Sequence, residues 1–388
     1  MSDQEIPGGV EPFRAIVLSR LAHRLKVEGR SIIHMEFGQP STGAPAAAVA
    51  RAHQVLDSDG MGYWESPDLR ARISRLYRDR YGVEVHPDRI VLTCGASPAL
   101  VLALTSRFRP GARIAMARPG YVAYRNTVRA LGMIPVEIGC GPETRFQLTA
   151  ELLAEAGPLD GVILASPANP TGSLIPGPAL RAIAAWCRAN GVRIISDEIY
   201  HGLTYGEPTP TILSLDPDAM VINSFSKYWS MAGWRLGWLV ASEDGIDAAR
   251  AHVGNLFLSP PSLSQHAGLV AMDCAEELEG HVAAYARNRA LMLEALPGLG
   301  LDRIAPPDGA FYIWADISHL TDDSLAFCEA LLRDTGVATA PGVDFDPVDG
   351  HRFMRFSFAV STDEVREALN RVGPWLRART DRQPQEAS

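Results

Sequence analysis

Residues 221–239 (VINSFSKYWSMAGWRLGWL) group residue types that could bind a carbonyl compound and a phosphate together. Lys227 follows a short apolar run, and a lysine condenses with carbonyls when desolvation or a cationic neighbour lowers its pKa. The hydroxyls of Ser224 and Ser226 and the guanidinium of Arg235 suit a phosphate dianion. A lysine that forms a Schiff base beside a phosphate site points to pyridoxal phosphate. The plain alternative is a surface lysine after a strand, with the serines and glycines as turn residues.

The same residues form the pattern S-x-S-K-x5-G-x-R-x-G, which resembles the cofactor-lysine signature of the class I/II aminotransferases, the fold-type-I pyridoxal-phosphate enzymes. Further motifs of this family follow in order from Gly38 to Arg355, over nearly the whole chain. The resemblance implies a transferase of nitrogenous groups that moves the amino group of an L-amino acid to a 2-oxo acid through a Schiff base at Lys227. It also implies pyridoxal 5'-phosphate as the cofactor and a homodimer as the assembly.

Size and composition describe a large globular protein and exclude several classes of function. The chain has 388 residues, 47% of them hydrophobic, which is enough for a large core and two domains. Its net charge is −9 without a long run of one sign, which argues against nucleic acid or an anionic membrane as the main partner. Five scattered cysteines predict neither disulfides nor a zinc site, the histidines show no metal-ligand spacing, and a reducing cytoplasm is the expected location. We find no secretory signal and no long apolar run, so we expect no membrane span.

The elements that must position the candidate residues follow from the apolar pattern of the central region. Seven short, almost wholly apolar runs recur there, at 90–92, 113–117, 134–138, 162–165, 192–196, 220–222 and 236–241. Most are separated by helical stretches, at 98–107, 121–131, 149–156 and 178–189. Continuous apolar strands that alternate with helices predict an α/β fold, with a mostly parallel sheet covered by helices on both faces.

The segments on either side of this region predict a second, smaller α+β domain. Helical spacing marks 11–28, 44–56 and 67–81 before it, and 262–297, 322–335 and 362–376 after it. Short strand candidates lie at 31–35, 310–315, 337–340 and 353–358. We therefore expect an N-terminal arm that joins the small domain (1–45), a large cofactor-binding domain (46–280) and a C-terminal small domain (281–388).

The candidate residues all fall at one edge of the predicted sheet. In parallel α/β sheets, ligands bind outside the carboxyl ends of the strands. Directly after or at the end of an apolar run stand Ala96 and Ser97, Tyr121, Asn169, Asp197 and Lys227. Because unrelated polar residues would be scattered along the elements, this placement indicates a ligand site independently of the resemblance.

Asp197 ends an apolar strand, so its carboxylate is expected to be buried and to need a partner. A protonated pyridine nitrogen would be such a partner and would strengthen the ring as an electron sink, whereas capping of the next helix is the plain alternative. By resemblance, D-E-x-Y (197–200) is the family motif for the pyridine nitrogen, and its Tyr200 hydrogen-bonds the cofactor's phenolic oxygen. Asn169, in N-P-T-G, would donate to the same oxygen and to the substrate carboxylate, or else it only forms a turn.

Ala96 and Ser97 open a helix, whose free N–H groups and dipole favour an anion. Together with Ser224, Ser226 and Arg235 they would complete a phosphate site. Helix starts that contain serine and glycine are common, so this motif depends on the others for its interpretation.

Arg355 is embedded in apolar sequence, and its planar fork fits a carboxylate bidentately. By resemblance it binds the α-carboxylate of the amino acid, with the backbone of Gly38 nearby; an internal ion pair is the alternative. Tyr121 resembles the aromatic that stacks on the pyridine ring, or it packs at a helix start. Tyr63 would reach the phosphate of the neighbouring subunit, although the spacer WESPD after it is shorter than usual. Selectivity for the substrate side chain is expected from Phe13, Tyr63, Trp64 and Trp229.

Two other functions use the same residues. A C–S or β-lyase, or another fold-type-I enzyme, is possible because the cofactor does the chemistry and the protein selects the bond that breaks. The other is a non-catalytic, cofactor-binding effector domain of a transcription regulator. Such a regulator is expected to carry a basic winged-helix domain ahead of this module, but the module begins within about the first 40 residues, which leaves no room for that domain. No basic residue stands out in the sequence as a partner for the second carboxylate of a dicarboxylate substrate. The resemblance suggests 2-oxoglutarate as the amino acceptor.

Overall fold

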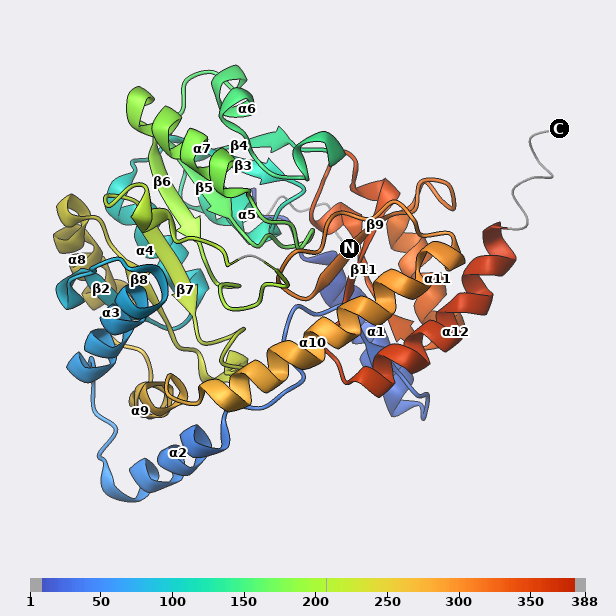
Figure 1. Ribbon diagram of the computed structural model, residues 1–388, viewed down its shortest axis with the longest axis horizontal. Helices are drawn as coiled ribbons and strands as arrows, with labels where there is room; N and C mark the ends of the chain where they lie inside the picture. Colours follow the sequence, from blue (N-terminus) through green and yellow to red (C-terminus); the bar gives the residue numbers. More distant parts are fainter. Residues whose placement is uncertain (1–8, 207, 381–388) are drawn as a thin grey trace.

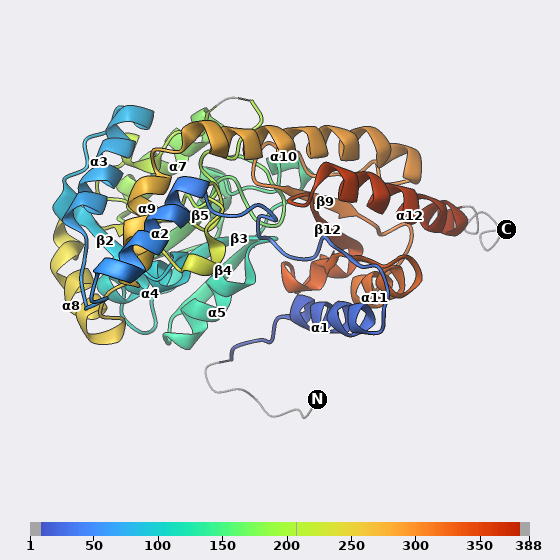
Figure 2. The same cartoon turned by 90° about the horizontal axis from the view of Figure 1, so that it is seen from below.

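The computed structural model describes residues 9–206 and 208–380. These residues form a larger body built around a sheet and a smaller body that holds the C-terminal part of the chain (Figure 1). The long helix α10 (Ala275–Ala295) runs across both bodies, which is clearest in Figure 2. None of the helices in this described part of the chain combines the length and the apolar character that a membrane span needs.

The larger body contains the seven-stranded, mostly parallel sheet that the apolar runs predict. Its strands are β2 (Ile90–Thr93), β3 (Arg113–Arg118), β4 (Ile134–Gly139), β5 (Gly161–Ala165), β6 (Arg193–Asp197), β7 (Met220–Ser224) and β8 (Gly237–Val240). Their order across the sheet is β2-β8-β7-β6-β5-β3-β4, in which β8 is antiparallel to both of its neighbours and the other pairs are parallel. All seven predicted runs are therefore strands of one sheet.

The strands are apolar throughout because both faces of the sheet are covered. Val162 and Leu164 of β5 belong to one hydrophobic cluster, whereas Ile163 between them belongs to a second cluster on the opposite face. Alternate residues of a strand point to opposite faces, so each face of the sheet has its own core. The helices of this body are α2 (Ala46–Ser58), α3 (Pro67–Tyr81), α4 (Ala96–Arg107), α5 (Val122–Ala130), α6 (Ala150–Glu155), α7 (Gly177–Asn190), α8 (Ile246–Leu256) and α9 (Ser262–Ala271).

Two differences from the predicted helices concern the end of this body. The helix expected over 262–297 is divided into α9 and α10 by a short break, and α8 was not predicted. In contrast, α3 begins and ends where predicted. Ser66 caps it by accepting a hydrogen bond from the amide of Leu69 at 3.1 Å, and Gly82 ends it in the left-handed conformation at φ 68°.

The smaller body is an α+β unit to which the N-terminal segment adds a strand and a helix. Its antiparallel sheet has the order β11 (Ala340–Pro341), β12 (Phe353–Ser357), β9 (Tyr312–Asp316), and its helices are α11 (Ser324–Thr335) and α12 (Thr362–Thr380). The N-terminal strand β1 (Ile33–His34) pairs in parallel with β10 (Val337–Ala338), and α1 (Arg14–Val27) packs on α11 and β11. On these contacts we propose domain boundaries near residues 45 and 280, the second of which lies within α10.

Candidate active site

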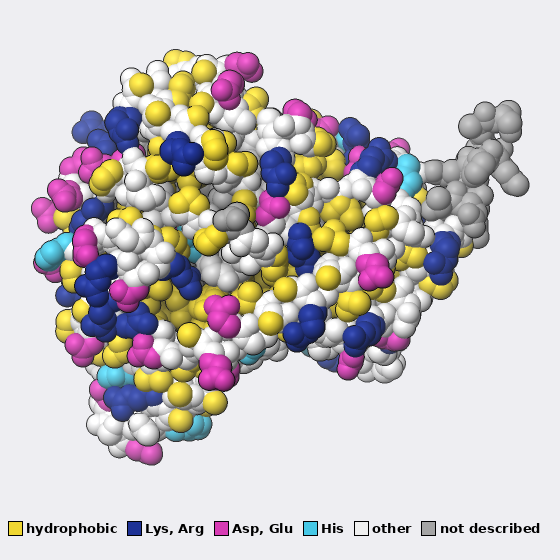
Figure 3. Space-filling view, viewed as in Figure 1, with side chains coloured by type: hydrophobic (Ala, Val, Ile, Leu, Met, Phe, Trp, Pro, Cys, Tyr) yellow, Lys and Arg dark blue, Asp and Glu magenta, His cyan; other side chains and the backbone are white. Residues whose placement is uncertain are grey.

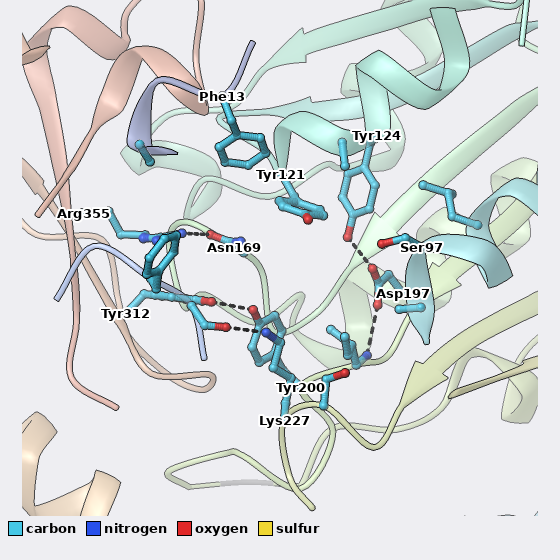
Figure 4. Close-up of a pocket in the computed structure, with 18 of the residues that line it drawn as sticks. Phe13, Ser97, Tyr121, Tyr124, Asn169, Asp197, Tyr200, Lys227, Tyr312 and Arg355 are labelled. Carbon is cyan, nitrogen blue, oxygen red and sulfur yellow. Dashed lines mark hydrogen bonds between the residues drawn. The ribbon is translucent and has the colours of Figure 1, made fainter. Parts of the chain in front are cut away.

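A cavity of about 360 Å³ lies where the two bodies meet, at the carboxyl ends of β5, β6 and β7 (Figure 4). Eleven of the residues that the sequence predicts for the site line it: Gly38, Ala96, Ser97, Tyr121, Asn169, Asp197, Tyr200, Ser226, Lys227, Arg235 and Arg355. Ser224 and Tyr63 do not line it. The residues predicted for this edge of the sheet therefore line one cavity, to which the small body contributes Arg355.

Lys227 follows β7 and points into the cavity, where its amine donates a hydrogen bond to the carbonyl oxygen of Gly38 (Figure 4). Desolvation is the main cause that lowers the pKa of Lys227, to about 8. The positive charges of Arg355 and Arg235 contribute to this lowering, while the carboxylate of Asp197 opposes it. An amine with this pKa is partly neutral near physiological pH, as a nucleophile and a general base both require.

Asp197 ends β6 and is only 7% exposed. Its carboxylate accepts a hydrogen bond from the hydroxyl of Tyr124 at 2.6 Å and one from the amide of Ile199 at 3.1 Å. No basic side chain among the described residues forms an ion pair with it, and burial raises the pKa of Asp197. A buried carboxylate without a cation suits a ligand that brings a protonated nitrogen.

Tyr124 was not among the predicted site residues, although it lies three positions after Tyr121 on α5. Residues three apart share a helix face, so a predicted ligand contact at Tyr121 also places Tyr124 toward the site. The two rings meet edge to face at 5.5 Å between their centroids. This spacing is the signal that could have found it.

The start of α4 lies beside Arg235 and has the open amides that the predicted phosphate site needs. Gly95 precedes the helix at φ 99°, and no side chain caps the helix there, so its first amides are open to a ligand. A Cβ on Gly95 would lie 2.5 Å from Nη2 of Arg235, so glycine allows the guanidinium to approach the helix. Arg235 is held by the carbonyl oxygens of Cys94 and Ala232, at 3.0 and 2.9 Å.

The two serines of the lysine motif differ in position. Ser226 lines the cavity, whereas Ser224 is fully buried behind it. The hydroxyl of Ser224 lies 2.8 Å from that of Ser226 and donates to the carbonyl oxygen of Leu236 at 2.9 Å. In this structure Ser224 therefore supports Ser226, and its direct contact with a phosphate remains a prediction.

Arg355 projects from β12 into the cavity, and only some of its guanidinium N–H groups are used in hydrogen bonds. It donates through Nη1 to Oδ1 of Asn169 at 2.7 Å and through Nη2 to the carbonyl oxygen of Glu36. Its guanidinium lies 4.5 Å from the ring centroid of Tyr312 and 4.6 Å from that of Phe345. Nε is buried without a partner, and within the described residues no ion pair includes Arg355. The alternative of an internal ion pair is therefore not found in this part of the chain.

Tyr312 is a second site residue that the sequence did not reveal. Its hydroxyl lies 2.6 Å from that of Tyr200, and a Cβ on Gly38 would overlap it (Figure 4). Tyr312 therefore connects three parts of the site: the D-E-x-Y motif, the Gly38 turn and, through its ring, Arg355. It stands in the apolar segment GAFYIW (309–314), and nothing in that context predicts a role for the hydroxyl.

The residues expected to select the substrate side chain divide into two groups. Phe13 lines the cavity, with its ring centroid 6.1 Å from that of Tyr121. Trp229 is only 2% exposed and packs against Trp238 in the core, so its predicted role in selectivity is wrong. Trp64 stacks on His266 outside the cavity, and Tyr63 is 86% exposed, so that its contact with a neighbouring subunit stays a prediction.

Comparisons with known proteins all match this chain to aminotransferases over almost its full length. The family model "Aminotransferase class I and II" matches residues 31–372. A valine–pyruvate aminotransferase of Mycobacterium tuberculosis is 48% identical over 377 residues, which cover 95% of this chain and 97% of that protein. An aspartate/prephenate aminotransferase of Thermus thermophilus is 30% identical, covering 93% and 95%. The crystal structure of an aminotransferase from Mycobacterium tuberculosis has a TM-score of 0.94 at 47% identity and covers 97% of this chain and 100% of that one.

Proposed function

Because the chain belongs to the class I and II aminotransferases, we propose that it moves the amino group of a small aliphatic L-amino acid, valine first among them, to a 2-oxo acid such as pyruvate. One observation carries this choice of substrates. Among the described residues that line the cavity, the only lysine and arginines are Lys227, Arg235 and Arg355. Each has a task that every substrate of the family needs, so none is left for a side-chain carboxylate. The relative named as a valine–pyruvate aminotransferase supports the same choice.

The part of the cavity left for the substrate side chain is largely apolar. Phe13 and Ile16 come from the N-terminal segment, Phe37 from the segment after β1, and Tyr121 from the start of α5. Apolar walls favour an aliphatic group by excluding water from it. An acidic side chain would lose its hydration there without gaining a partner, which costs several kcal/mol.

This family depends on pyridoxal phosphate, and the residues present fit that cofactor. Lys227 would carry its aldehyde, and Asp197 would pair with its pyridine nitrogen. Ala96, Ser97, Ser226 and Arg235 would hold its phosphate, with Ser224 behind them. Tyr121 would face the ring, while Asn169 and Tyr200 would bond its phenolic oxygen. When bound, the cofactor supplies an electron sink for the bond that breaks at Cα. The fit rests on the carboxylate of Asp197 without a cation, the open start of α4 and the desolvated amine.

The chain's own residues would then divide the work of the reaction. Arg355 binds the α-carboxylate of the amino acid through donors that the structure leaves free, and the Asn169 amide fixes the guanidinium beside it. Lys227 takes the proton from Cα with its Nζ, because its lowered pKa leaves the amine partly neutral. Tyr124 donates to Asp197, and this bond favours the ionised carboxylate next to the pyridine nitrogen, against the effect of burial on the pKa of Asp197.

We also propose a homodimer in which Tyr63 reaches the partner's phosphate site. Tyr63 is 86% exposed, and Leu56 and Met61 close to it in sequence are exposed as well. Apolar side chains exposed near each other often mark an interface. If the proposal holds, Tyr63→Phe and Lys227→Ala proteins that are each inactive or impaired would regain activity when mixed and refolded together. Failure to regain any activity in a mixture shown to contain heterodimers would contradict the shared site.

The proposed function is tested by absorbance of the purified, cofactor-loaded protein while single amino acids are added. Valine should shift the cofactor band from the aldehyde to the amine form, and aspartate should do so far more weakly. Pyruvate should then restore the aldehyde band. Lys227→Ala should abolish the shift. Release of ammonia and pyruvate from a β-substituted amino acid, without the amine form, would instead identify a lyase.

A further inference from the structure

Residues 36–38 bring two backbone carbonyl groups to two cations of the site. The carbonyl oxygen of Glu36 accepts from Arg355, and that of Gly38 accepts from Lys227. Before this segment, the backbone is held by neighbouring strands, since Met35 bonds to Ala338 at 2.9 Å and Ser357 bonds to Met35 at 2.8 Å. Within the described residues, no backbone–backbone hydrogen bond then holds the chain until Ser41. The segment that meets both cations therefore lies beyond the strand ladder.

A side-chain contact anchors this segment instead. Oε1 of Glu36 lies 2.8 Å from Nδ1 of His34, two residues earlier on β1. The Glu36 side chain is completely buried, and its Oε2 has no hydrogen-bond partner in the described part of the chain. The His34 side chain is 32% exposed, so the imidazole reaches solvent on one side and the buried carboxylate on the other. A buried carboxylate without a charged partner is strongly unfavourable, so this contact fixes where Glu36 lies.

The charge of the pair depends on pH. The hydrogen bond to Glu36 raises the pKa of His34 above its usual value, against partial burial. Two other charged groups act on the imidazole: Lys26 at the end of α1 lowers this pKa and Glu364 at the start of α12 raises it. Within these surroundings His34 keeps its proton to a higher pH than a free histidine.

We propose that His34 and Glu36 form a positioning pair, in which the imidazolium holds the Glu36 carboxylate so that the carbonyl oxygen of the same residue orients Arg355 toward a substrate carboxylate. This inference rests on the proposed role of Arg355 in binding that carboxylate. Neither His34 nor Glu36 contacts the reacting atoms, and both act through Arg355.

The contact between His34 and Glu36 gives the pair its pH dependence. When His34 loses its proton, the bond that fixes Glu36 weakens and the orientation of Arg355 is less well determined. The affinity of the site for carboxylates should therefore fall as the pH rises through the pKa of His34. In turnover, the change should appear in KM and leave kcat nearly unchanged, since the proton transfer at Lys227 is not involved.

The probe is 3-methylbutanoate, which has a carboxylate and an aliphatic chain but no amine that titrates or reacts. Its binding to the protein saturated with pyridoxal phosphate is measured by calorimetry between pH 5.5 and 9, for wild type and variants. His34→Leu should weaken binding about fivefold at low pH, the size of one hydrogen bond. His34→Gln, which keeps a donor without a charge, should recover part of this loss and flatten the pH dependence. His53→Gln, an exposed histidine on α2, is the matched control and should behave as wild type.

Melting temperatures of the three variants separate loss of binding from loss of folding, and Glu36→Gln offers a second route if His34→Leu does not fold. Glu36→Gln should also flatten the pH dependence. Binding of 3-methylbutanoate by His34→Gln with the same affinity and pH dependence as wild type would overturn the inference. The inference would also fail if His34→Leu lowered kcat for valine while KM stayed constant. A wild-type protein that binds no 3-methylbutanoate would remove the proposed role of Arg355, and this inference with it.

Discussion

The lowered pKa of Lys227 makes a quantitative prediction for the reaction of this lysine with pyridoxal phosphate. Only the neutral amine attacks an aldehyde, so the rate should follow the neutral fraction. With a pKa of about 8, in place of 10.5 for an ordinary lysine, about half of the amine is neutral at pH 8 instead of about 0.3%. At that pH the folded site should therefore hold over one hundred times more neutral amine than an exposed lysine.

The assay is the rise of the cofactor's visible band after stopped-flow mixing of cofactor-free protein with pyridoxal phosphate, between pH 7 and 10. The rate should rise with pH and level off above about 8. Nα-acetyl-lysine amide serves as the control. The rate of its reaction with pyridoxal phosphate should keep rising about tenfold per pH unit over this range, because the pKa of its amine lies above the range. If the rate measured for the protein rose like that of the control up to pH 10, the lowering of the Lys227 pKa by desolvation would be refuted.

Two variants test the stated causes of the shift, with opposite signs. Arg355 lowers the pKa of Lys227, so Arg355→Met should move the plateau to higher pH. Asp197 raises it, so Asp197→Asn should move the plateau to lower pH. If both substitutions shifted the plateau in the same direction, the charge balance described for the cavity would be wrong.

Three further predictions concern groups that hold the ligands. Tyr124→Phe removes the donor to Asp197 and should weaken cofactor binding about tenfold in an absorbance titration. The control is Tyr228→Phe, which loses a 2.6 Å hydrogen bond to Glu279 outside the cavity and should leave cofactor binding unchanged. Arg355→Lys should raise KM for valine about a hundredfold in steady-state assays, because an ammonium cannot bind a carboxylate bidentately; a KM near that of wild type would contradict the clamp. Gly95→Ala should lower the free energy of unfolding in urea by about 1–3 kcal/mol and weaken cofactor binding, since φ is 99° and the added Cβ meets Arg235; an unchanged urea midpoint would contradict this.

The sheet was predictable because burial on both faces makes its strands apolar without interruption, as in residues 162–165 and 220–222. Helix α3 was predictable to the residue because local signals mark both ends: Ser66 with Pro67 at the start and Gly82 at the end. Helix α8 carries no such pattern, since Ala249 is its only fully buried residue among those described. The break between α9 and α10 contains neither proline nor glycine, so tertiary packing sets it where local chemistry does not.

Site residues were predictable where topology alone places them. Lys227, Asp197 and Asn169 follow strands, and parallel strands bring their carboxyl ends to one edge. Contacts between distant segments were not predictable in this way: Tyr124 lies 73 positions from Asp197, and Glu36 lies 319 from Arg355. Trp229 shows the opposite error, because nearness to Lys227 in sequence says nothing about which way a ring faces once the chain turns into the core.

The charge distribution of the site connects these observations. Over the surface seen in Figure 3, acidic and basic side chains are interspersed on both bodies. In the cavity, by contrast, the three cations Lys227, Arg235 and Arg355 form no ion pair with any described residue, and Asp197 is the only acidic side chain identified as acting on the Lys227 pKa. Like charges held together without direct ion pairs oppose folding, although Asp197 and Asp344 offset part of the repulsion. The remaining cost in stability would be returned by anionic ligands when they bind. A phosphate at Arg235 and a carboxylate at Arg355 would each remove part of that repulsion. The charges of Arg355 and Arg235, which add to desolvation in lowering the pKa of Lys227, would thus also favour a ligand with one anion at each end of the site.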